Sequence, residues 1–345
     1  MDLKELSKMD FKDLFQKGKG TSKGTGRSVS SVLGLDFGAE AVNAVRLKKS
    51  KGKIELLGAE ILPLPDVLAE SMDIPAALGD RYAALCSTFP RSTVRVFNYT
   101  PQGEYMLNDV VRENFNVSEE FRVGGILLKE SRKDHLILGV STPSEPVEKM
   151  LSLFSDGPPA LCAIEYAGLS SVASFLFQKG AQTQSRTVCL IDGGTSSITV
   201  SFFVDNKLQI INQFDFGKAS LLKEIEKGLG IDAETAEDIA KEGAVDISSF
   251  VQSTLGSVSK QLSISKEFVE RQNRSRLSGC YLSGELALVP SWGGLLGKSM
   301  EIPSEVWNPF ESFVLPESGL PETIQGREPL FASAVGVALS SMEVL

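Results

Sequence analysis

The sequence has very little histidine and cysteine, which limits the metal chemistry open to it. It contains one histidine, His135, and no Cys-x-x-Cys pair. Because a histidine metal site needs a second histidine, such a site is excluded, and we expect His135 to be structural. The cysteines lie far apart and three of the four are in apolar runs, which predicts buried free thiols in a reducing compartment rather than disulfides or zinc ligands. They are Cys86, Cys162, Cys189 and Cys280.

Long apolar runs and an excess of positive charge are also absent. No stretch of about 18 apolar residues is present to span a bilayer, and the N-terminus has no apolar core of a secretory signal. The net charge is −9, with 35 Lys and Arg against 44 Asp and Glu. Acidity of this size argues against a nucleic-acid partner. We therefore expect a cytoplasmic protein of two or three domains, since 345 residues suffice for that number.

The N-terminal 31 residues differ in composition from the rest. Residues 1–16 place apolar side chains on one broad helical face, and residues 17–31 form a Gly/Ser/Lys linker. This pattern predicts a flexible leader with an amphipathic helix. Two interpretations stay open, a tethered helix that recognises a partner or membrane surface, and a weakly structured leader.

Two Asp-Gly hairpins dominate the body of the chain. Residues 188–203 are two apolar runs around Asp192-Gly193-Gly194-Thr195, and residues 32–47 repeat that layout around Asp36 and Gly38. Each alone is typical of an ordinary glycine turn. Turn amides uncovered by glycine can also form an anion site, and an aspartate at the strand end can hold a hydrated Mg²⁺. The repetition favours the second interpretation.

The remaining segments predict three bodies. Residues 93–157 have a strand, helix, strand, strand, helix pattern and form an inserted subdomain. Residues 32–92 and 158–186 form a first lobe, and residues 187–345 a second. Within these bodies we expect helices over residues 76–86, 105–115, 146–154, 168–177, 221–229, 232–242, 247–273 and 330–339.

These features together resemble the actin-like ATPase superfamily. The two hairpins, a later strand ended by Ser283-Gly284 and a final helix rich in small residues carry that resemblance. It implies an α/β actin-like ATPase (ribonuclease H-like) fold, in which two lobes hold a nucleotide. Within the superfamily the chain is most similar to the PilM family of type IV pilus assembly proteins. The position of the inserted subdomain carries this likeness, together with residues 35–38, 44–47, 216–218, 229–231, 236–237, 281–284 and 307–310.

The resemblance implies ATP and Mg²⁺ as cofactors and assigns a nucleotide site. Asp36 and Asp192 would hold Mg²⁺ through water, whereas no catalytic residue can be assigned. The implied nucleotide-binding residues are Asp36, Gly38, Asp192, Gly193, Gly194, Thr195, Gly217, Glu237 and Gly284.

Several positions depart from the family pattern. Gly284 is followed by Glu285 and Leu286 where further glycines are usual, so an acid would oppose bound phosphates. Ala240 stands where a lysine often follows Glu237, and that lysine is displaced by one position. We therefore predict a partly eroded nucleotide site and at most a weak ATPase.

The resemblance also implies a function. It predicts a cytoplasmic scaffold at the inner membrane, in a type IV pilus or related secretion platform. The scaffold would bind the cytoplasmic tail of a PilN-like protein in a groove between residues 93–157 and the first lobe. Self-association and a membrane contact through residues 1–16 stay open. The alternatives are an active actin-like ATPase, a sugar-kinase-like phosphotransferase and an FtsA-like cell-division protein.

Overall fold

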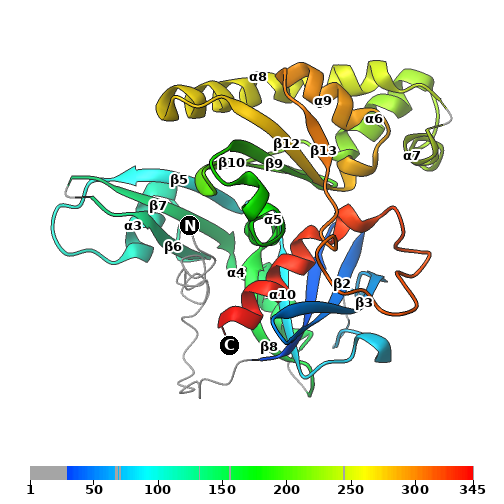
Figure 1. The fold of residues 1–345 in the computed structure, drawn as a ribbon, viewed down its shortest axis with the longest axis horizontal. Helices are drawn as coiled ribbons and strands as arrows, with labels where there is room; N and C mark the ends of the chain where they lie inside the picture. Colours follow the sequence, from blue (N-terminus) through cyan, green and yellow to red (C-terminus); the bar gives the residue numbers. More distant parts are fainter. Residues whose placement is uncertain are drawn as a thin grey trace. The chain divides into compact units, whose positions relative to one another are not determined.

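A computed structural model describes residues 29–66, 69, 71–131, 133–154, 157–243 and 245–344. The predicted helix over residues 1–16 lies outside this range. The chain divides into two compact units (Figure 1). The first takes the chain through Phe177, together with Phe310–Gln325 and the residues from Ser333 onward, and the second comprises Gln178–Pro309 and Gly326–Ala332. No helix among the described residues is both long and apolar enough to cross a bilayer.

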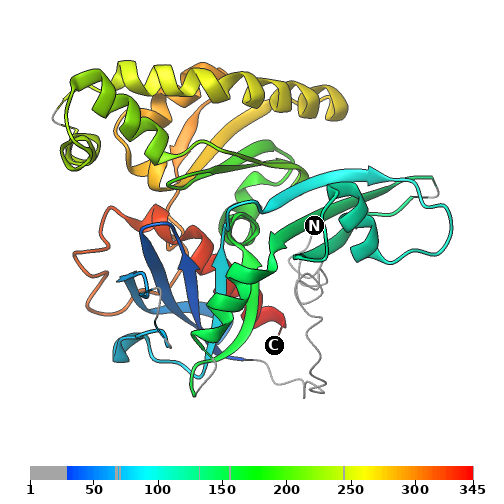
Figure 2. The same ribbon diagram turned by 180° about the vertical axis from the view of Figure 1, so that it is seen from behind.

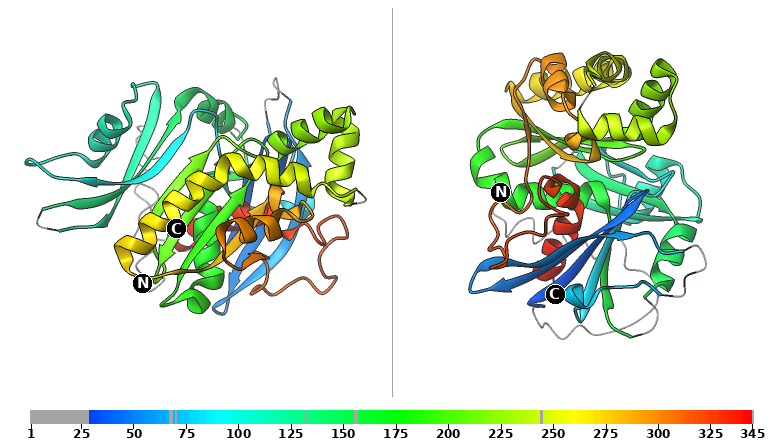
Figure 3. Two further views of the ribbon diagram at one scale, coloured as in Figure 1. Left: turned by 90° about the horizontal axis from the view of Figure 1, so that it is seen from above. Right: turned by 90° about the vertical axis from the view of Figure 1, so that its right-hand side faces the viewer.

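The first unit is built on a five-stranded sheet of order β3-β2-β1-β4-β8. β1 pairs antiparallel with β2 and β2 with β3, whereas β4 and β8 extend the sheet in parallel. Figure 3 shows β2 and β3 running side by side. The strands are β1 Ser31–Phe37, β2 Ala41–Ser50, β3 Lys53–Pro63, β4 Tyr82–Ser87 and β8 Ala160–Tyr166.

The second unit repeats this topology. Its sheet has the order β11-β10-β9-β12-β13, with two antiparallel pairs followed by two parallel pairs. In both hairpins a glycine amide donates across the turn over 3.0 Å, from Gly38 to Ala41 and from Gly194 to Ser197. The strands are β9 Thr187–Gly193, β10 Ile198–Val204, β11 Lys207–Phe214, β12 Leu277–Gly284 and β13 Ser304–Val306.

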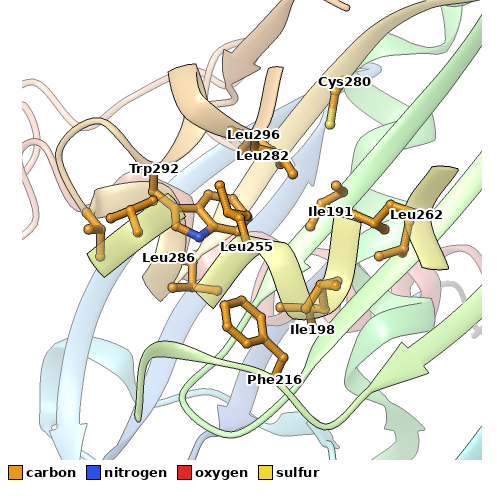
Figure 4. Packing of buried hydrophobic residues seen from close by; sticks show 14 of the residues in the cluster. Ile191, Ile198, Phe216, Leu255, Leu262, Cys280, Leu282, Leu286, Trp292 and Leu296 are labelled. Atoms are coloured by element: carbon orange, nitrogen blue, oxygen red, sulfur yellow. The ribbon is translucent and has the colours of Figure 1, made fainter. Parts of the chain in front are cut away.

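One face of the second sheet is covered by helices. Ile191, Ile198 and Leu282 point from the strands into an apolar cluster with Leu255 and Trp292 (Figure 4). Because side chains alternate along a strand, Asp192 lies on the opposite face from Ile191. The covering helices are α6 Lys218–Leu229, α7 Ala233–Glu242, α8 Ser248–Asn273 and α9 Trp292–Met300.

In the first unit, α5 (Ala167–Thr183) and α10 (Ala332–Val344) meet at small residues. A Cβ built on Gly336 of α10 would lie 1.7 Å from the carbonyl oxygen of Ser170, and one built on Gly34 of β1 would lie 2.2 Å from that of Ala334. Only glycine permits backbones to approach so closely. The final helix therefore packs in the first unit, which differs from its expected place in a lobe of residues 187–345.

The insertion has the predicted order of elements. β5, β7 and β6 form a three-stranded sheet with β7 in the centre, and α3 covers one face of it (Figure 2). Val110 and Val111 of α3 pack on Ile137 of β7. The elements are β5 Thr93–Tyr99, α3 Leu107–Phe115, β6 Phe121–Lys129, β7 His135–Pro143 and α4 Ser144–Ser152.

The helix expected over residues 76–86 is wrong. This stretch forms a short 3₁₀ turn, Ala76–Leu78, and then the strand β4. From Ala83 to Ser87 every residue of β4 is buried, because the strand lies between β1 and β8 and is covered on both faces. Such strands lose the alternating pattern that marks a strand in the sequence.

Candidate functional site

The second hairpin lies at the carboxyl end of β9, next to the end of β12. The Ser283 hydroxyl donates to Oδ1 of Asp192 over 2.9 Å. The next residue, Gly284, has φ of +77°, and a Cβ there would lie 2.5 Å from the Gly193 carbonyl oxygen. Leu286 is fully buried, and a Cβ built on Gly193 would lie 2.7 Å from the Cβ of Leu286. The predicted residues Asp192, Gly193 and Gly284 are therefore brought together by adjacent strand ends.

The turn of this hairpin is bonded to the start of α6. The amides of Lys218 and Ala219 donate to the carbonyls of Gly194 and Thr195 over 3.0 and 2.8 Å. A Cβ on Gly217 would lie 2.4 Å from the Thr195 carbonyl oxygen, so glycine is required at that position. Helix N-terminal amides are common anion donors, but here two of them are occupied by the hairpin.

A carboxylate of the protein itself reaches the turn. Thr195 donates its hydroxyl proton to Oε1 of Glu285 over 2.5 Å. Nζ of Lys218 lies 2.9 Å from Oε2 of Glu285 and 3.0 Å from Oε1 of Glu237. Glu285 thus occupies the hydroxyl and ammonium groups that would otherwise be offered to an anion.

Glu237 completes this ion-pair network from α7. Partial burial acts to raise its pKa, but the hydrogen bonds and charges of Lys241 and Lys218 hold the pKa below its ordinary value. Lys241, predicted to be displaced, still reaches Glu237 over 3.0 Å because residues four apart share a helix face. Ala240 is instead buried in the apolar cluster.

Some groups of this hairpin are open to an anion, and others are engaged within the protein. Within the described chain, the amides of Thr195 and Ser196 donate to no backbone carbonyl, so they could face an anion. The carboxylate of Glu285 is bonded to the side chain of Thr195, however, and would repel a phosphate there.

The first hairpin is surrounded by different side chains. Asp36, Cys86 and Glu165 are paired neighbours across β1, β4 and β8, so all three project from one face of the sheet. The Cys86 thiol lies 3.7 Å from Oδ1 of Asp36. Burial raises the pKa of Cys86, and the negative charges of Asp36 and Glu165 raise it further. Gly38 is exposed at the turn.

Glu165 was missed by the sequence analysis. Its side chain accepts a hydrogen bond from the Ser170 hydroxyl over 2.8 Å, and the residue is only 4% exposed. Burial raises its pKa to about 8, against the opposing effect of that hydrogen bond. A buried acid at a parallel-strand end is a signal for a functional group. The surrounding residues 160–166 are otherwise mostly apolar and gave no motif.

The predicted metal ligands belong to different units, Asp36 to the first and Asp192 to the second. In the described residues, no group of three or more His, Cys, Asp or Glu side chains is arranged to hold a metal ion. Their role toward Mg²⁺ through water stays a prediction.

The chain is similar to known proteins both in sequence and in fold. A family model described as "Type IV pilus assembly protein PilM" matches residues 162–342. Among solved structures, the chain is similar to one described as a "PilM-PilN type IV pilus biogenesis complex", with 18% identity, a TM-score of 0.74, and coverage of 92% of this chain and 99% of that chain. This likeness confirms the predicted actin-like ATPase fold.

Weaker similarity extends to two other proteins. One is the ethanolamine utilization protein EutJ from Carboxydothermus hydrogenoformans, with 12% identity, 97% coverage of each chain and a TM-score of 0.49. The other is MreB 5 of Spiroplasma citri bound to AMPPNP, with 11% identity, coverage of 91% and 96%, and a TM-score of 0.45.

Proposed function

The chain belongs to the PilM family of type IV pilus assembly proteins, and from this membership we propose that it is a scaffold of a pilus assembly platform. Its partner is the cytoplasmic tail of a PilN-like membrane protein. The observation that carries the proposal is the family match, together with a fold that covers 99% of the chain solved in a PilM-PilN complex. The platform is that of a type IV pilus, and the alternative is the inner-membrane platform of a related secretion system.

The tail binds in a groove between residues 93–157 and the rest of the first unit. A small subdomain with unpaired strand edges suits an extended peptide, because backbone groups at an edge can pair with an added strand. β5 and β6 are the two edges of the insertion sheet. The partner then holds the protein at the inner membrane, to which the protein is peripheral.

A peptide of the partner's cytoplasmic tail tests the proposal. The full chain is mixed with a fluorescent synthetic tail that carries one photoreactive residue, and binding is followed by anisotropy. We expect saturable binding, with cross-links mapped by mass spectrometry to residues 93–157 and the first unit. Absence of binding would contradict the function, whereas cross-links confined to residues 187–309 would contradict only the site.

Two matched variants sharpen the location. Leu127 on β6 is 37% exposed and Leu229 on α6 is 42% exposed, so a charge at either position should be tolerated by the fold. We expect Leu127→Glu to weaken tail binding about tenfold or more and Leu229→Glu to leave it unchanged. Equal effects of both variants would argue against the insertion as the binding site.

A nucleotide-dependent scaffold is the second candidate, favoured by the two equivalent hairpins. Since Glu285 contacts Thr195 and Lys218 at the second hairpin, we derive no catalytic step from the hairpins. Calorimetry of the full chain with ATP and Mg²⁺, beside Asp192→Ala, tests this function. Heat of binding that is lost in Asp192→Ala would support this function. No heat in either protein would contradict it and would leave a scaffold that works without nucleotide.

A further inference from the structure

An exposed basic turn joins β2 and β3 in the first unit. Lys51 and Gly52 both have positive φ, which is the geometry of a tight two-residue hairpin turn. The turn gathers lysines from both strands, and all of them are exposed. We call them the basic turn: Lys48, Lys49, Lys51 and Lys53.

The basic turn is weakly neutralised. No ion pair joins its lysines to a carboxylate among the described residues. Glu55 is the cross-strand neighbour of Lys48, and it is only half-buried. Nearby Arg46 is paired with Asp80 over 3.0 Å and adds little charge. In a chain of net charge −9, this is a local reversal of sign.

Exposed aliphatic side chains flank the basic turn. The backbone of Val314 bonds along β3, accepting from Leu56 over 2.9 Å and donating to Ile54 over 2.9 Å. Val314 thereby bridges Glu55, the β3 position that pairs with Lys48. We call the flanking group the aliphatic rim: Leu57 at 38%, Val314 at 45% and Leu315 at 42% exposed.

The preceding segment enters the fold at the same place. The Lys49 amide donates to the Ser30 carbonyl over 2.7 Å. Residues 17–30 contain four basic residues and no acidic one, and these are Lys17, Lys19, Lys23 and Arg27.

We infer that the basic turn and the aliphatic rim bind the surface of an anionic phospholipid bilayer. Lysines near such a surface are attracted by its negative potential, and aliphatic side chains beside them can enter the headgroup region. A polynucleotide would gain nothing from the aliphatic rim, and its length would bring it against an acidic protein. The contact needs no partner protein, so it stands independently of PilN binding.

Flotation of the purified full chain with vesicles tests the inference. The probe is vesicles of equal parts phosphatidylglycerol and phosphatidylethanolamine, with phosphatidylcholine vesicles as the neutral comparison. We expect binding to the anionic vesicles alone, and its loss at about 1 M salt, where the screening length falls to about 3 Å. Inorganic phosphate should not compete. Binding to phosphatidylcholine, or release by phosphate, would overturn the inference.

The decisive variant replaces all four lysines of the basic turn with glutamine. Each lysine near an anionic surface contributes about fivefold to partitioning, so we expect a loss of about a hundredfold or more. The matched control removes the same charge elsewhere, at exposed Lys207, Lys223, Lys227 and Lys260. Circular dichroism checks that both variants are folded. Retained binding in the first variant, or equal loss in the control, would overturn the inference.

Two further measurements separate the sources of binding. A chain lacking residues 1–28 should bind more weakly and should still lose binding when the basic turn is changed to glutamine. If the shortened chain does not bind vesicles, the turn is not the site and the inference fails. A single-stranded oligonucleotide bound as tightly as the vesicles would show a general polyanion site and would also overturn it.

Discussion

At the scale of single residues, Glu285 decides what the second hairpin offers to a ligand. Its carboxylate is held by the Thr195 hydroxyl and the Lys218 ammonium, the groups that a phosphate would use. A charge within about 4 Å of a phosphate opposes binding by about 1 to 4 kcal/mol near a protein surface.

Replacement of Glu285 should therefore improve nucleotide binding. We expect Glu285→Gln to tighten ATP binding about tenfold or more, because a repelling charge is removed and Lys218 keeps its ion pair with Glu237 but loses the one with Glu285. Isothermal titration calorimetry with ATP and Mg²⁺ measures this. The control is Glu224→Gln on the exposed face of α6. Unchanged affinity in Glu285→Gln would show that Glu285 does not block the site.

Glu165 should make stability depend on pH. Its folded pKa, about 8, lies above the ordinary value, so the folded state holds a proton that the unfolded state has released between about pH 4.5 and 8. Its contribution is therefore fully present in acid and is lost as the pH rises through the folded pKa. We expect the free energy of unfolding of the wild type to fall by about 2 to 4 kcal/mol across this window, and we expect Glu165→Gln not to show this fall.

Urea denaturation from pH 5 to pH 9 checks this expectation, with exposed Glu317→Gln as the control. Identical pH profiles for the wild type and Glu165→Gln would show that the buried carboxyl does not titrate in this range.

At the scale of elements, the geometry of the second hairpin depends on the neighbouring strand that contacts its turn. β9 and β12 end side by side, and the backbone at Gly284 turns against the Gly193 carbonyl. The start of α7 is fixed by local chemistry, because the side chain of the N-cap residue Asp232 accepts a hydrogen bond from the Thr235 amide over 2.9 Å.

The end of β12 should tolerate no side chain at Gly284. We expect Gly284→Ala to lower the free energy of unfolding by about 2 kcal/mol or more, through positive φ and the 2.5 Å approach to the Gly193 oxygen. Gly279 lies on the same strand, and a Cβ there meets nothing closer than 3.6 Å. Gly279→Ala should therefore be nearly neutral in chemical denaturation. Equal losses in the two variants would contradict the backbone argument.

At the scale of the whole molecule, the first unit is assembled from distant segments. α10 follows the second unit in the chain but packs against β1 and α5 of the first. Stability of the first unit should therefore depend on the last helix.

A helix-interior glycine of α10 tests this dependence, and one of α8 is the control. Gly336→Ala places a Cβ 1.7 Å from the Ser170 oxygen, and we expect it to lower the free energy of unfolding by about 3 kcal/mol or more. Gly256→Ala in α8 meets nothing within 4 Å and should stabilise by about 0.5 to 1 kcal/mol. Thermal and urea unfolding measure both. A neutral Gly336→Ala would show that α10 can move away at little cost.

The sequence by itself determined the fold and the hairpins. Asp36-Phe37-Gly38 and Asp192-Gly193-Gly194 are local patterns, in which strand alternation and turn chemistry act over a few residues. The order of these patterns then sufficed to indicate the actin-like fold, now confirmed, and the family.

Only the tertiary structure decided what the sites contain. Glu165 meets Cys86 and Asp36 because three strands pair in register, and Glu285 meets Thr195 because β9 and β12 are neighbours. The strand β4 was likewise recognised only in the structure, because it is buried on both faces and its sequence lacks the alternation of apolar and polar residues. Contacts between residues far apart in the chain arise from sheet pairing and packing, which a local sequence pattern does not encode.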